Sequence, residues 1–307
     1  MLARGFEMRM ALLVSTTVAA LVAGAATVFA SERHSADQEV SADPRGTVEV
    51  SNFAGRVEVT GWDKPLVSVH SNLTGDIENV DVQSDHGRTS IKVRMHRFSF
   101  GFGGEADLEI KIPKGSELDV TSVSADVISN GMVGVQRLKT VSGAIRADIG
   151  PGDTEAKTVS GEIVLRGNGK PVALHTTSIS GNIRLERGAG DVEATTVSGD
   201  LSFQLDPGRA IRMRNTSGSI NIQGKLAKDA DIDAQTVSGE VRLHAPAENG
   251  YEYEVSTFSG DIRDCFNVKP EKTSQYGPGE RLNGALGKGE GHVRIKTMSG
   301  SVDLCDK

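Results

Sequence analysis

The chain has 307 residues, a formal net charge of −7, and 36 glycines with only 4% aromatic residues. The acidic balance argues against nucleic acid or anionic lipid as the main partner, because both need a basic surface. A compact domain of this length would need more large apolar side chains, so the composition favours a repeat architecture in which many short strands share a narrow core.

The first thirty residues form a targeting segment. Arg4 and Arg9 precede an uncharged, mostly apolar run over residues 11–30, and small residues stand before Ser31 in a pattern typical of signal-peptide cleavage. Residues 1–30 are therefore predicted to be a signal peptide that is removed. The run is twenty residues long, enough to span a bilayer, so an uncleaved membrane anchor remains the alternative.

The next two segments lack a long period. Residues 31–46 are polar and of mixed charge, which predicts a disordered leader. Over residues 47–117, apolar and polar residues alternate in several short runs, such as 57–59 and 91–93, which is typical of strands with one buried face. An open edge of stacked strands would favour aggregation, so we interpret 47–117 as a β-rich N-terminal cap on the strands that follow.

From residue 118 onward, a four-residue phrase recurs about every twenty residues. Its clearest copies read Thr-Val-Ser-Gly, and the third residue is serine in every copy. The copies end at Ala125 (a degenerate first copy), Gly143, Gly161, Gly181, Gly199, Gly218, Gly239, Gly260 and Gly300. The intervals are 18, 18, 20, 18, 19, 21, 21 and 40 residues, so the last interval predicts one repeat with an insertion near residues 267–288.

Each copy of the phrase separates two short strands. Apolar residues recur two and four positions after the glycine, as at Ile163 and Leu165, and seven and five positions before it, as at Val192 and Ala194. The two sets are out of phase by an odd number of residues, so one straight strand would expose one set to solvent. The chain is therefore predicted to turn a corner at Ser-Gly, where glycine permits the backbone angles of a bend.

Such repeats cannot bury their own apolar face, so each must stack on the next. The sequence thus predicts an all-β protein, a single-domain parallel β-solenoid (β-helix) of about nine coils over residues 118–307. We expect right-handed winding, because parallel strand crossovers are almost always right-handed.

The repeats resemble a known family. Together with residues 52–59 (NFAGRVEV) and 61–65 (GWDKP), they are similar to a bacterial β-strand-repeat family named "putative adhesin", whose function is unassigned. The resemblance covers about residues 47–307. It implies the repeat fold and a place in the cell envelope, and it implies no catalytic residues.

The two cysteines occupy the same place in their repeats. Cys265 and Cys305 each stand five residues after the closing glycine, Gly260 or Gly300. Stacked coils would place them one above the other, within the Cα separation that a disulfide accepts. In an oxidising compartment we therefore expect a Cys265–Cys305 disulfide that keeps the last coil from fraying.

The recurring serines and threonines are interpreted as structural. A nucleophilic serine needs a base within reach, and no histidine accompanies the column of recurring serines. We expect the serines to form hydrogen bonds at the corner and the threonines to form a stacked ladder. The seven histidines show no metal-ligand spacing, and the calcium-binding nonapeptide is missing, so we expect no catalytic residue, no cofactor and no metal.

Two kinds of surface are candidates for binding. Outward positions beside the corner carry mixed charges, which suit a polar polymer and suit a solvated face equally well. These residues are Arg146, Arg184, Glu240, Arg242, Asp261 and Arg263. The other candidates are loops: the insertion before Cys305, and an aromatic, glycine-rich segment with Phe98, Phe100 and Phe102, which could contact a partner or cover the apolar end of the cap.

These features favour an exported, non-enzymatic envelope protein in the periplasm or on the cell surface. It would be an adhesin-like binder or scaffold for an envelope protein or polysaccharide, with membrane contact only through an uncleaved N-terminal segment. Two alternatives remain. One is a carbohydrate-active β-solenoid enzyme, against which the lack of a carboxylate groove and of an aromatic sugar platform weighs. The other is a membrane-anchored sensory or regulatory module of the envelope stress response.

Overall fold

The computed structural model describes residues 34–96, 103–245, 250–265, 268–274, 277–287 and 290–304. Every regular element in these ranges is a β-strand, which confirms the all-β prediction. Among the described residues there is no helix that is both long and apolar enough to cross a membrane. The predicted signal peptide (1–30) lies outside the described residues.

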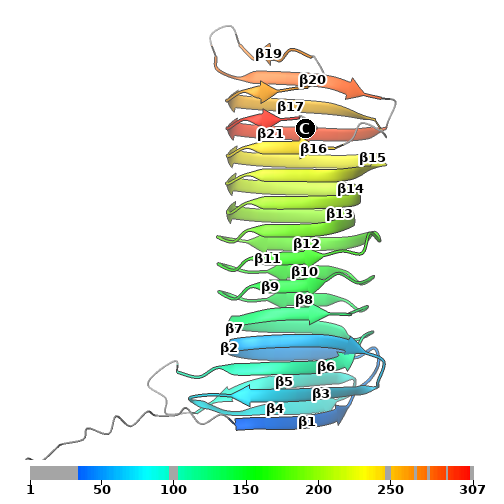
Figure 1. Cartoon of the computed structure of the whole chain (residues 1–307), viewed down its shortest axis with the longest axis vertical. Helices are drawn as coiled ribbons and strands as arrows, with labels where there is room; N and C mark the ends of the chain where they lie inside the picture. The colour runs from blue at the N-terminus through cyan, green and yellow to red at the C-terminus, as the bar shows by residue number, and fades with distance from the viewer. Residues whose placement is uncertain are drawn as a thin grey trace, which may run out of the picture. The chain divides into compact units, whose positions relative to one another are not determined.

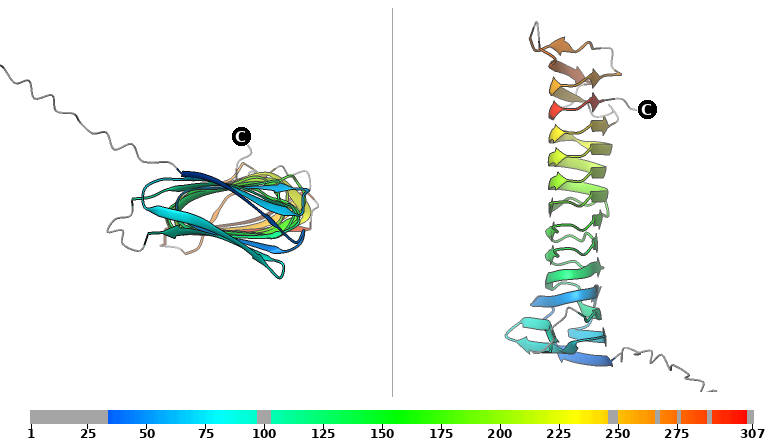
Figure 2. Two further views of the ribbon diagram at one scale, coloured as in Figure 1. Left: turned by 90° about the horizontal axis from the view of Figure 1, so that it is seen from below. Right: turned by 90° about the vertical axis from the view of Figure 1, so that its left-hand side faces the viewer.

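Most strands belong to stacked coils, each of which runs through a first strand, a corner at the four-residue phrase and a second strand (Figure 1). Parallel, in-register pairing joins β8 to β10 and β12 on one face, and β9 to β11 and β13 on the other. The strands in the middle of the stack are β7 (Glu117–Asn130), β8 (Gln136–Lys139), β9 (Ile145–Asp148), β10 (Thr154–Lys157), β11 (Ile163–Arg166), β12 (Val172–Ser178), β13 (Ile183–Ser198), β14 (Leu201–Ser217) and β15 (Ile220–Ser238). Seen along the stack, the coils superimpose as a flattened oval with two long faces (Figure 2).

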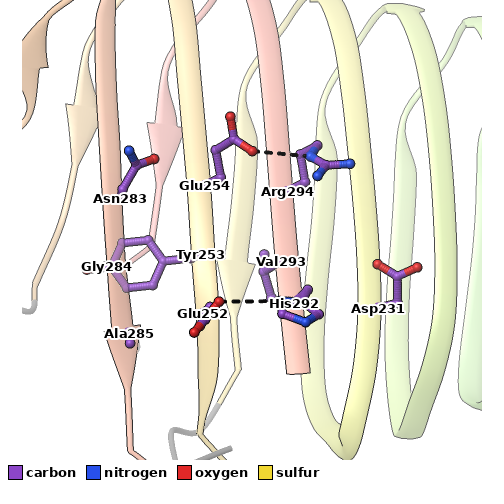
Figure 3. A pocket seen from close by; sticks show the side chains of 10 residues that line it. All are labelled: Asp231, Glu252, Tyr253, Glu254, Asn283, Gly284, Ala285, His292, Val293 and Arg294. Atoms are coloured by element: carbon purple, nitrogen blue, oxygen red, sulfur yellow. Dashed lines mark hydrogen bonds and ion pairs between the residues drawn. The ribbon is translucent and has the colours of Figure 1, made fainter. Parts of the chain in front are cut away.

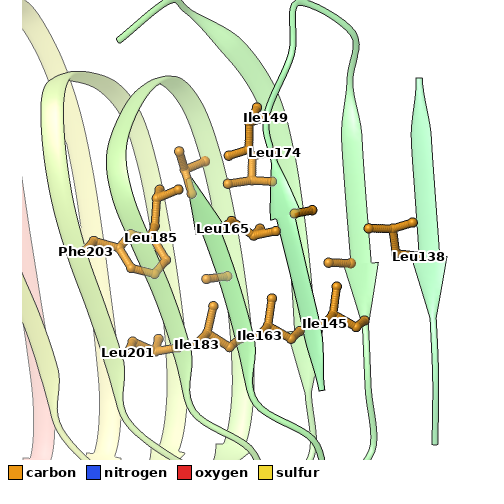
Figure 4. Close-up of a cluster of buried hydrophobic side chains, with 14 of the residues drawn as sticks. Leu138, Ile145, Ile149, Ile163, Leu165, Leu174, Ile183, Leu185, Leu201 and Phe203 are labelled. Atoms are coloured by element: carbon orange, nitrogen blue, oxygen red, sulfur yellow. The ribbon is translucent and has the colours of Figure 1, made fainter. Parts of the chain in front are cut away.

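The core lies between the two faces and is built from the predicted inward positions (Figure 4). The column two residues after the corner is buried at every level, with relative exposure of 6% or less. In stack order it contains Val127, Ile145, Ile163, Ile183, Leu201, Ile220, Val241, Val302 and Ile262. Large apolar side chains therefore stack on their equivalents, which gives a continuous core from few residues per coil.

The corner glycines are required by close packing between levels. A Cβ atom on Gly161 would clash with the carbonyl oxygen of Gly143, and one on Gly181 would clash with that of Gly161. Positive φ angles occur at Gly218, Gly239 and Gly260, but not at Gly143, Gly161, Gly181 and Gly199, the corner glycines of the four phrase copies before them. The prediction that glycine serves the bend through its backbone angles is therefore wrong for those earlier corners, where it serves the approach of the coil below.

The stack starts earlier in the chain than predicted. Strand β2 (Thr47–Trp62) bends around the corner and pairs in parallel with β7 along nearly its whole length, so it is a full coil and not only part of a cap. On its other side it pairs in parallel with β5 (Arg88–Met95) and β6 (Ala106–Pro113), which form one further level. The single-domain stack therefore extends through much of residues 47–117.

The N-terminal end is covered by antiparallel strands. Strand β3 (Leu66–Leu73) pairs with β6, and β4 (Ile77–Asp85) forms a hairpin with β5. Part of the predicted disordered leader (31–46) is ordered, because His34–Ser41 forms strand β1, antiparallel to β3. This strand is mostly exposed at the end of the sheet, so its sequence lacks the apolar alternation that would have identified it.

At the C-terminal end, the coils do not stack in chain order. Strand β21 (Gly291–Ser299) pairs in parallel with β15 on one side and with β17 (Tyr251–Ser259) on the other. Strand β22 (Val302–Asp303) likewise lies between β16 (Val241–His244) and β18 (Ile262–Arg263). The final coil is therefore inserted below the coil that precedes it. The predicted insertion near residues 267–288 covers this end of the stack. Its strand β20 (Glu280–Leu286) is antiparallel to β17, and its strand β19 (Glu271–Lys272) is antiparallel to β20.

Outward charges provide a physical reason for this order. In the observed stack, the positive Arg294 lies between Asp233 and Glu254. Chain-order stacking would place those two carboxylates directly on each other, about 4.8 Å apart, which is unfavourable for like charges. The inserted coil thus restores alternation of sign along the face.

The inserted order predicts which engineered cysteines can bond. Gln235 is paired with Lys296, which is paired on its other side with Ser256. With Cys265 and Cys305 replaced by serine, Gln235→Cys/Lys296→Cys should form a disulfide, because directly paired residues lie within its Cα range. Gln235→Cys/Ser256→Cys, two levels apart, should not. Mass spectrometry after mild oxidation distinguishes the two, and the opposite result would establish chain-order stacking.

The close packing at the corner predicts a selective loss of stability. Gly161→Ala should lower the free energy of unfolding by about 2 kcal/mol, because the added Cβ forces two coils apart. Ser160→Ala, at an exposed position in the same corner, should change it by less than about 0.5 kcal/mol. Urea denaturation measures both, and equal effects would contradict the close-packing explanation.

Candidate functional site

We call the face formed by the strands before each corner the first face, and the face formed by the strands after it the second face. The predicted charged surface lies on the second face, but its arginines do not form one continuous column. Arg146 and Arg184 are separated by the level that carries Val164. The two levels after Arg184 present Ser202 and Asn221 at the equivalent position. The middle of the predicted surface is therefore uncharged at this column.

The charges of this surface gather at the C-terminal end. Asp303, on the inserted coil, lies between Arg242 and Arg263, so the sign alternates over three levels. Glu240 forms an ion pair with Arg242 of its own coil, and Asp261 immediately precedes β18. The structure thus brings four of the six predicted residues together, and their role in binding stays a prediction.

Threonine side chains hold the corner, which corrects the expectation that the serines do so. Thr158 Oγ1 accepts a hydrogen bond from the backbone N–H of Gly161 at 2.9 Å and donates to the carbonyl of Val141 at 3.5 Å. The corner serines are exposed at every level, and it is the backbone N–H of Ser160 that bonds to Val141, at 2.9 Å. The threonines are therefore structural, as expected.

The second residue of the phrase forms an exposed apolar column along the corner, which we call the apolar ridge. In stack order it contains Val123, Val141, Val159, Ile179, Val197, Thr216, Val237, Met298 and Phe258. Eight of these nine are large apolar residues, each between 38% (Val123, Val159) and 67% (Phe258) exposed. Eight steps of about 4.8 Å give the ridge a length of about 38 Å.

Sequence reasoning missed this ridge, although the signal was present. The second residue of the phrase stands two positions before the glycine, out of phase with the buried residues that stand three, five and seven positions before it. Alternation therefore places it outside, where a polar residue is expected. A large apolar residue at eight of the nine copies of an outward position was the available evidence.

Opposite charges flank the ridge on its two sides. Four positions before the glycine, on the first face, the only charged residues are cations, which we call the cationic flank: Lys139, Lys157, Arg214 and Lys296. One position after the corner, on the second face, the charged residues of the nine phrase copies are all carboxylates, which we call the acidic flank: Asp126, Glu162, Asp200, Glu240 and Asp261. The level of β2, next to Asp126, carries Arg56 in this column. The carboxylates occupy every second level, because the intervening levels carry Ala144, Asn182, Ser219 and Ser301.

Several flank charges also serve the fold. Asp126 Oδ1 accepts the backbone N–H of Ala144 at 2.9 Å, and Asp200 Oδ1 accepts that of Ser219 at 2.8 Å. These carboxylates therefore bridge one level to the next while remaining at the surface. Beside the cationic flank, the ridge borders a hollow of about 510 Å³ lined by residues that include Thr216 and Met298.

A second candidate site is an open groove on the first face at the C-terminal end (Figure 3). It has a volume of about 670 Å³ and lies over the inserted coil, its two neighbours and β20. Its lining residues are Asp231, Glu252, Tyr253, Glu254, Asn283, Gly284, Ala285, His292, Val293 and Arg294. The groove exists because β20 covers the end of the stack antiparallel to β17.

Two of the three carboxylates that line this groove are paired with basic side chains of the inserted coil. Glu254 lies 3.3 Å from Arg294, and Glu252 lies 3.6 Å from His292. Burial and the nearby charge of Asp264 raise the pKa of Tyr253, so its phenol stays neutral at ordinary pH. The groove therefore offers compensated charges that can hold a polar ligand.

Several predicted residues fall outside the described part of the chain. Phe98, Phe100 and Phe102 do, so their role stays a prediction. Cys305 does as well, although the register that relates it to Cys265 is observed up to the pair Arg263 and Asp303, and the disulfide stays a prediction. Within the described ranges, no group of three or more His, Cys, Asp or Glu side chains could hold a metal ion.

The sequence matches the family described as Toastrack DUF4097 over residues 44–305, and the chain belongs to that family. No curated protein matches the sequence at a significant level.

Three solved structures are similar to most of the chain. A "putative adhesin" from Parabacteroides distasonis is 9% identical, with 88% of this chain and 97% of that chain covered and a TM-score of 0.44. A "putative adhesin" from Bacteroides fragilis is 9% identical, with 89% and 97% covered and a TM-score of 0.35. A "putative lipid binding protein" from P. distasonis is 12% identical, with 88% and 97% covered and a TM-score of 0.31. Similarity at this level supports no statement about the function of this chain.

Glu280 anchors β20, the strand that lines one side of the groove. The stability of this C-terminal cap should therefore depend on pH. Hydrogen bonds from Lys272 Nζ (2.7 Å) and from the backbone N–H of Ile262 (3.0 Å) lower its pKa below the usual range. A lowered pKa stabilises the fold above the unfolded value of about 4.3, and this contribution disappears as pH falls through the folded pKa.

Glu280→Gln should therefore weaken the docking of β20 at pH 7 by about 1 kcal/mol. Amide-exchange protection of β17 and β20 measures this loss, which should shrink at acidic pH, where the native carboxylate is also neutral. Glu252→Gln, at a side chain that is 69% exposed on the same cap, should leave protection nearly unchanged. A loss that persists undiminished in acid would contradict the role of the Glu280 charge.

Proposed function

We propose that the protein is an exported, non-enzymatic envelope protein, an adhesin-like binder or scaffold whose coils form a right-handed β-solenoid. The observation that carries the proposal is the apolar ridge. Monomeric soluble proteins rarely expose long contiguous apolar surfaces, and those that occur mark interaction sites. Here the surface follows one edge of the stack over about 38 Å.

The ridge is suited to binding because its support is rigid. Five ridge residues follow a threonine or an asparagine whose side chain donates a hydrogen bond to a backbone carbonyl of the adjacent level, as Thr140 does to Ala125 at 3.3 Å. The neighbouring glycine packs closely against the next level. A partner would therefore meet a preformed surface and bind without ordering a loop, which lowers the entropic cost of association.

Export and oxidation are part of the same proposal. The apolar run and small-residue pattern of residues 1–30 support export to the periplasm or cell surface. In that compartment Cys265 and Cys305 would form their disulfide. Because the final coil is inserted below the coil of residues 251–263, this bond would join two adjacent levels and hold the inserted coil in place.

The groove is the observation that favours the second candidate, a carbohydrate-active enzyme. Three carboxylates line it, those of Asp231, Glu252 and Glu254. Glycoside hydrolysis needs one carboxyl group that holds a proton beside a second one that is charged. Glu252 and Glu254 are each paired with a basic side chain, His292 and Arg294, which favours a polar binding groove over an acid–base pair.

A binding assay with four ridge variants tests the proposal. Residues 31–307 should be retained on an immobilised envelope fraction, a peptidoglycan or a polysaccharide without release of a product. Changing Val141, Val159, Val197 and Val237 to threonine should reduce retention by about tenfold, which corresponds to about 1.4 kcal/mol. Threonine is tolerated in this column, because residue 216 already is one.

The control is Thr216→Val, which completes the ridge and should retain or strengthen binding. Release of a sugar product would identify an enzyme and overturn the proposal. Retention that ignores all the ridge variants would place binding elsewhere, and the groove would be the next surface to change.

A further inference from the structure

We infer that the apolar ridge pairs with the ridge of a second copy of this chain, in a dimer whose two-fold axis runs parallel to the stack. The inference rests on the proposed function, since it names the partner of the same ridge. Ten large apolar residues are exposed in the described ranges, and all but Val133 and Val268 lie on the ridge. The candidate contact surface is therefore confined to one edge.

The two flanks of the ridge make this edge self-complementary. The cationic flank lies on one side and the acidic flank on the other. A two-fold rotation about an axis parallel to the stack turns the second copy so that its acidic flank meets the cationic flank of the first. A two-fold axis perpendicular to the stack, which relates antiparallel stacks, would bring each flank against its own kind. Charge thus selects parallel stacks.

The levels of the charges also agree with such a rotation, because it keeps each level beside the same level of the second copy. Lys157 and Glu162 belong to one coil, so each Lys157 would face Glu162 of the other copy. Arg214 lies one level from Asp200 and one level from Glu240.

The remaining cations of the flank also lie close to the levels of carboxylates. Lys139 lies one level from Asp126 and from Glu162, and Lys296 lies one level from Glu240 and from Asp261. Every cation of the flank therefore has an opposing carboxylate within one step of about 4.8 Å along the stack.

The size of the ridge predicts a weak, closed dimer. A length of about 38 Å and a width of about 13 Å, four residues around the corner, give a footprint of about 500 Å². Stable interfaces bury about 800 Å² per partner, so dissociation constants in the micromolar range are expected. Each chain has one ridge, and the pairing buries it in both chains, so assembly stops at a dimer and does not continue into a filament.

Sedimentation equilibrium on residues 31–307 at low ionic strength, at up to about 100 µM, tests the inference above the expected dissociation constant. The native protein should be a dimer. Lys157→Glu places like charges opposite each other at two symmetric contacts, so it should raise the dissociation constant at least tenfold. Lys157→Glu/Glu162→Lys exchanges the charges and should restore the dimer. Lys170→Glu, at an exposed residue away from the ridge, should have no effect, and thermal unfolding confirms that each variant folds.

The outcomes separate this inference from the proposed function. A native protein that stays monomeric, or a charge exchange that fails to restore a dimer, overturns the parallel pairing. If retention on envelope material is nevertheless lost with the four valine-to-threonine changes, the ridge binds a different partner and the proposed function stands. If the protein is monomeric and retention also ignores the ridge, the pairing is wrong and binding lies on another surface.

Discussion

The structure depends on one constraint: each coil lies on the next in parallel register, so every residue packs against its equivalent about 4.8 Å away. Inside, this places isoleucine on isoleucine and builds a continuous core, as at Ile145, Ile163 and Ile183. At the corners from Gly143 onward it leaves no room for a Cβ atom, which explains the glycine there. On the outside, a residue type that is repeated at one position of every coil forms a continuous column along the whole stack.

The stacking of equivalent outward residues explains the arrangement of charges and the order of the last coils. A repeated carboxylate would stack on itself, and the acidic flank avoids this by occupying alternate levels. The alternation survives at the C-terminal end only because Ser301 of the inserted coil lies between the levels of Glu240 and Asp261. The same insertion separates Asp233 from Glu254 with Arg294. An apolar residue has no such repulsion to avoid, so it can repeat at nearly every level and form the ridge.

The sequence predicted the features that recur and missed those that occur once. The phase of Ile163 and Leu165 relative to the corner was sufficient for the all-β core, because register copies it to every level. The inserted coil could not be read from repeat spacing, since stacking order is a long-range choice; the charges of Asp233, Glu254 and Arg294 carried that information. Strand β1 was missed because it is exposed at an end of the sheet, and the ridge was missed because Val159 and its equivalents stand inside a phrase that already explains a corner.

The edge of the stack carries the apolar surface suited to interaction, the faces carry balanced charges, and the inferred dimer joins two ridges with their stacks parallel. Distances between spin labels on the ridge test this most directly, with cysteines placed singly at Val123, Val197 and Phe258 in a chain whose native cysteines are serine. Parallel stacks predict the same short distance at all three levels. Antiparallel stacks predict a short distance near the middle and about 38 Å at both ends, a result that would contradict the account, as would the absence of any dipolar coupling at concentrations where a micromolar dimer forms.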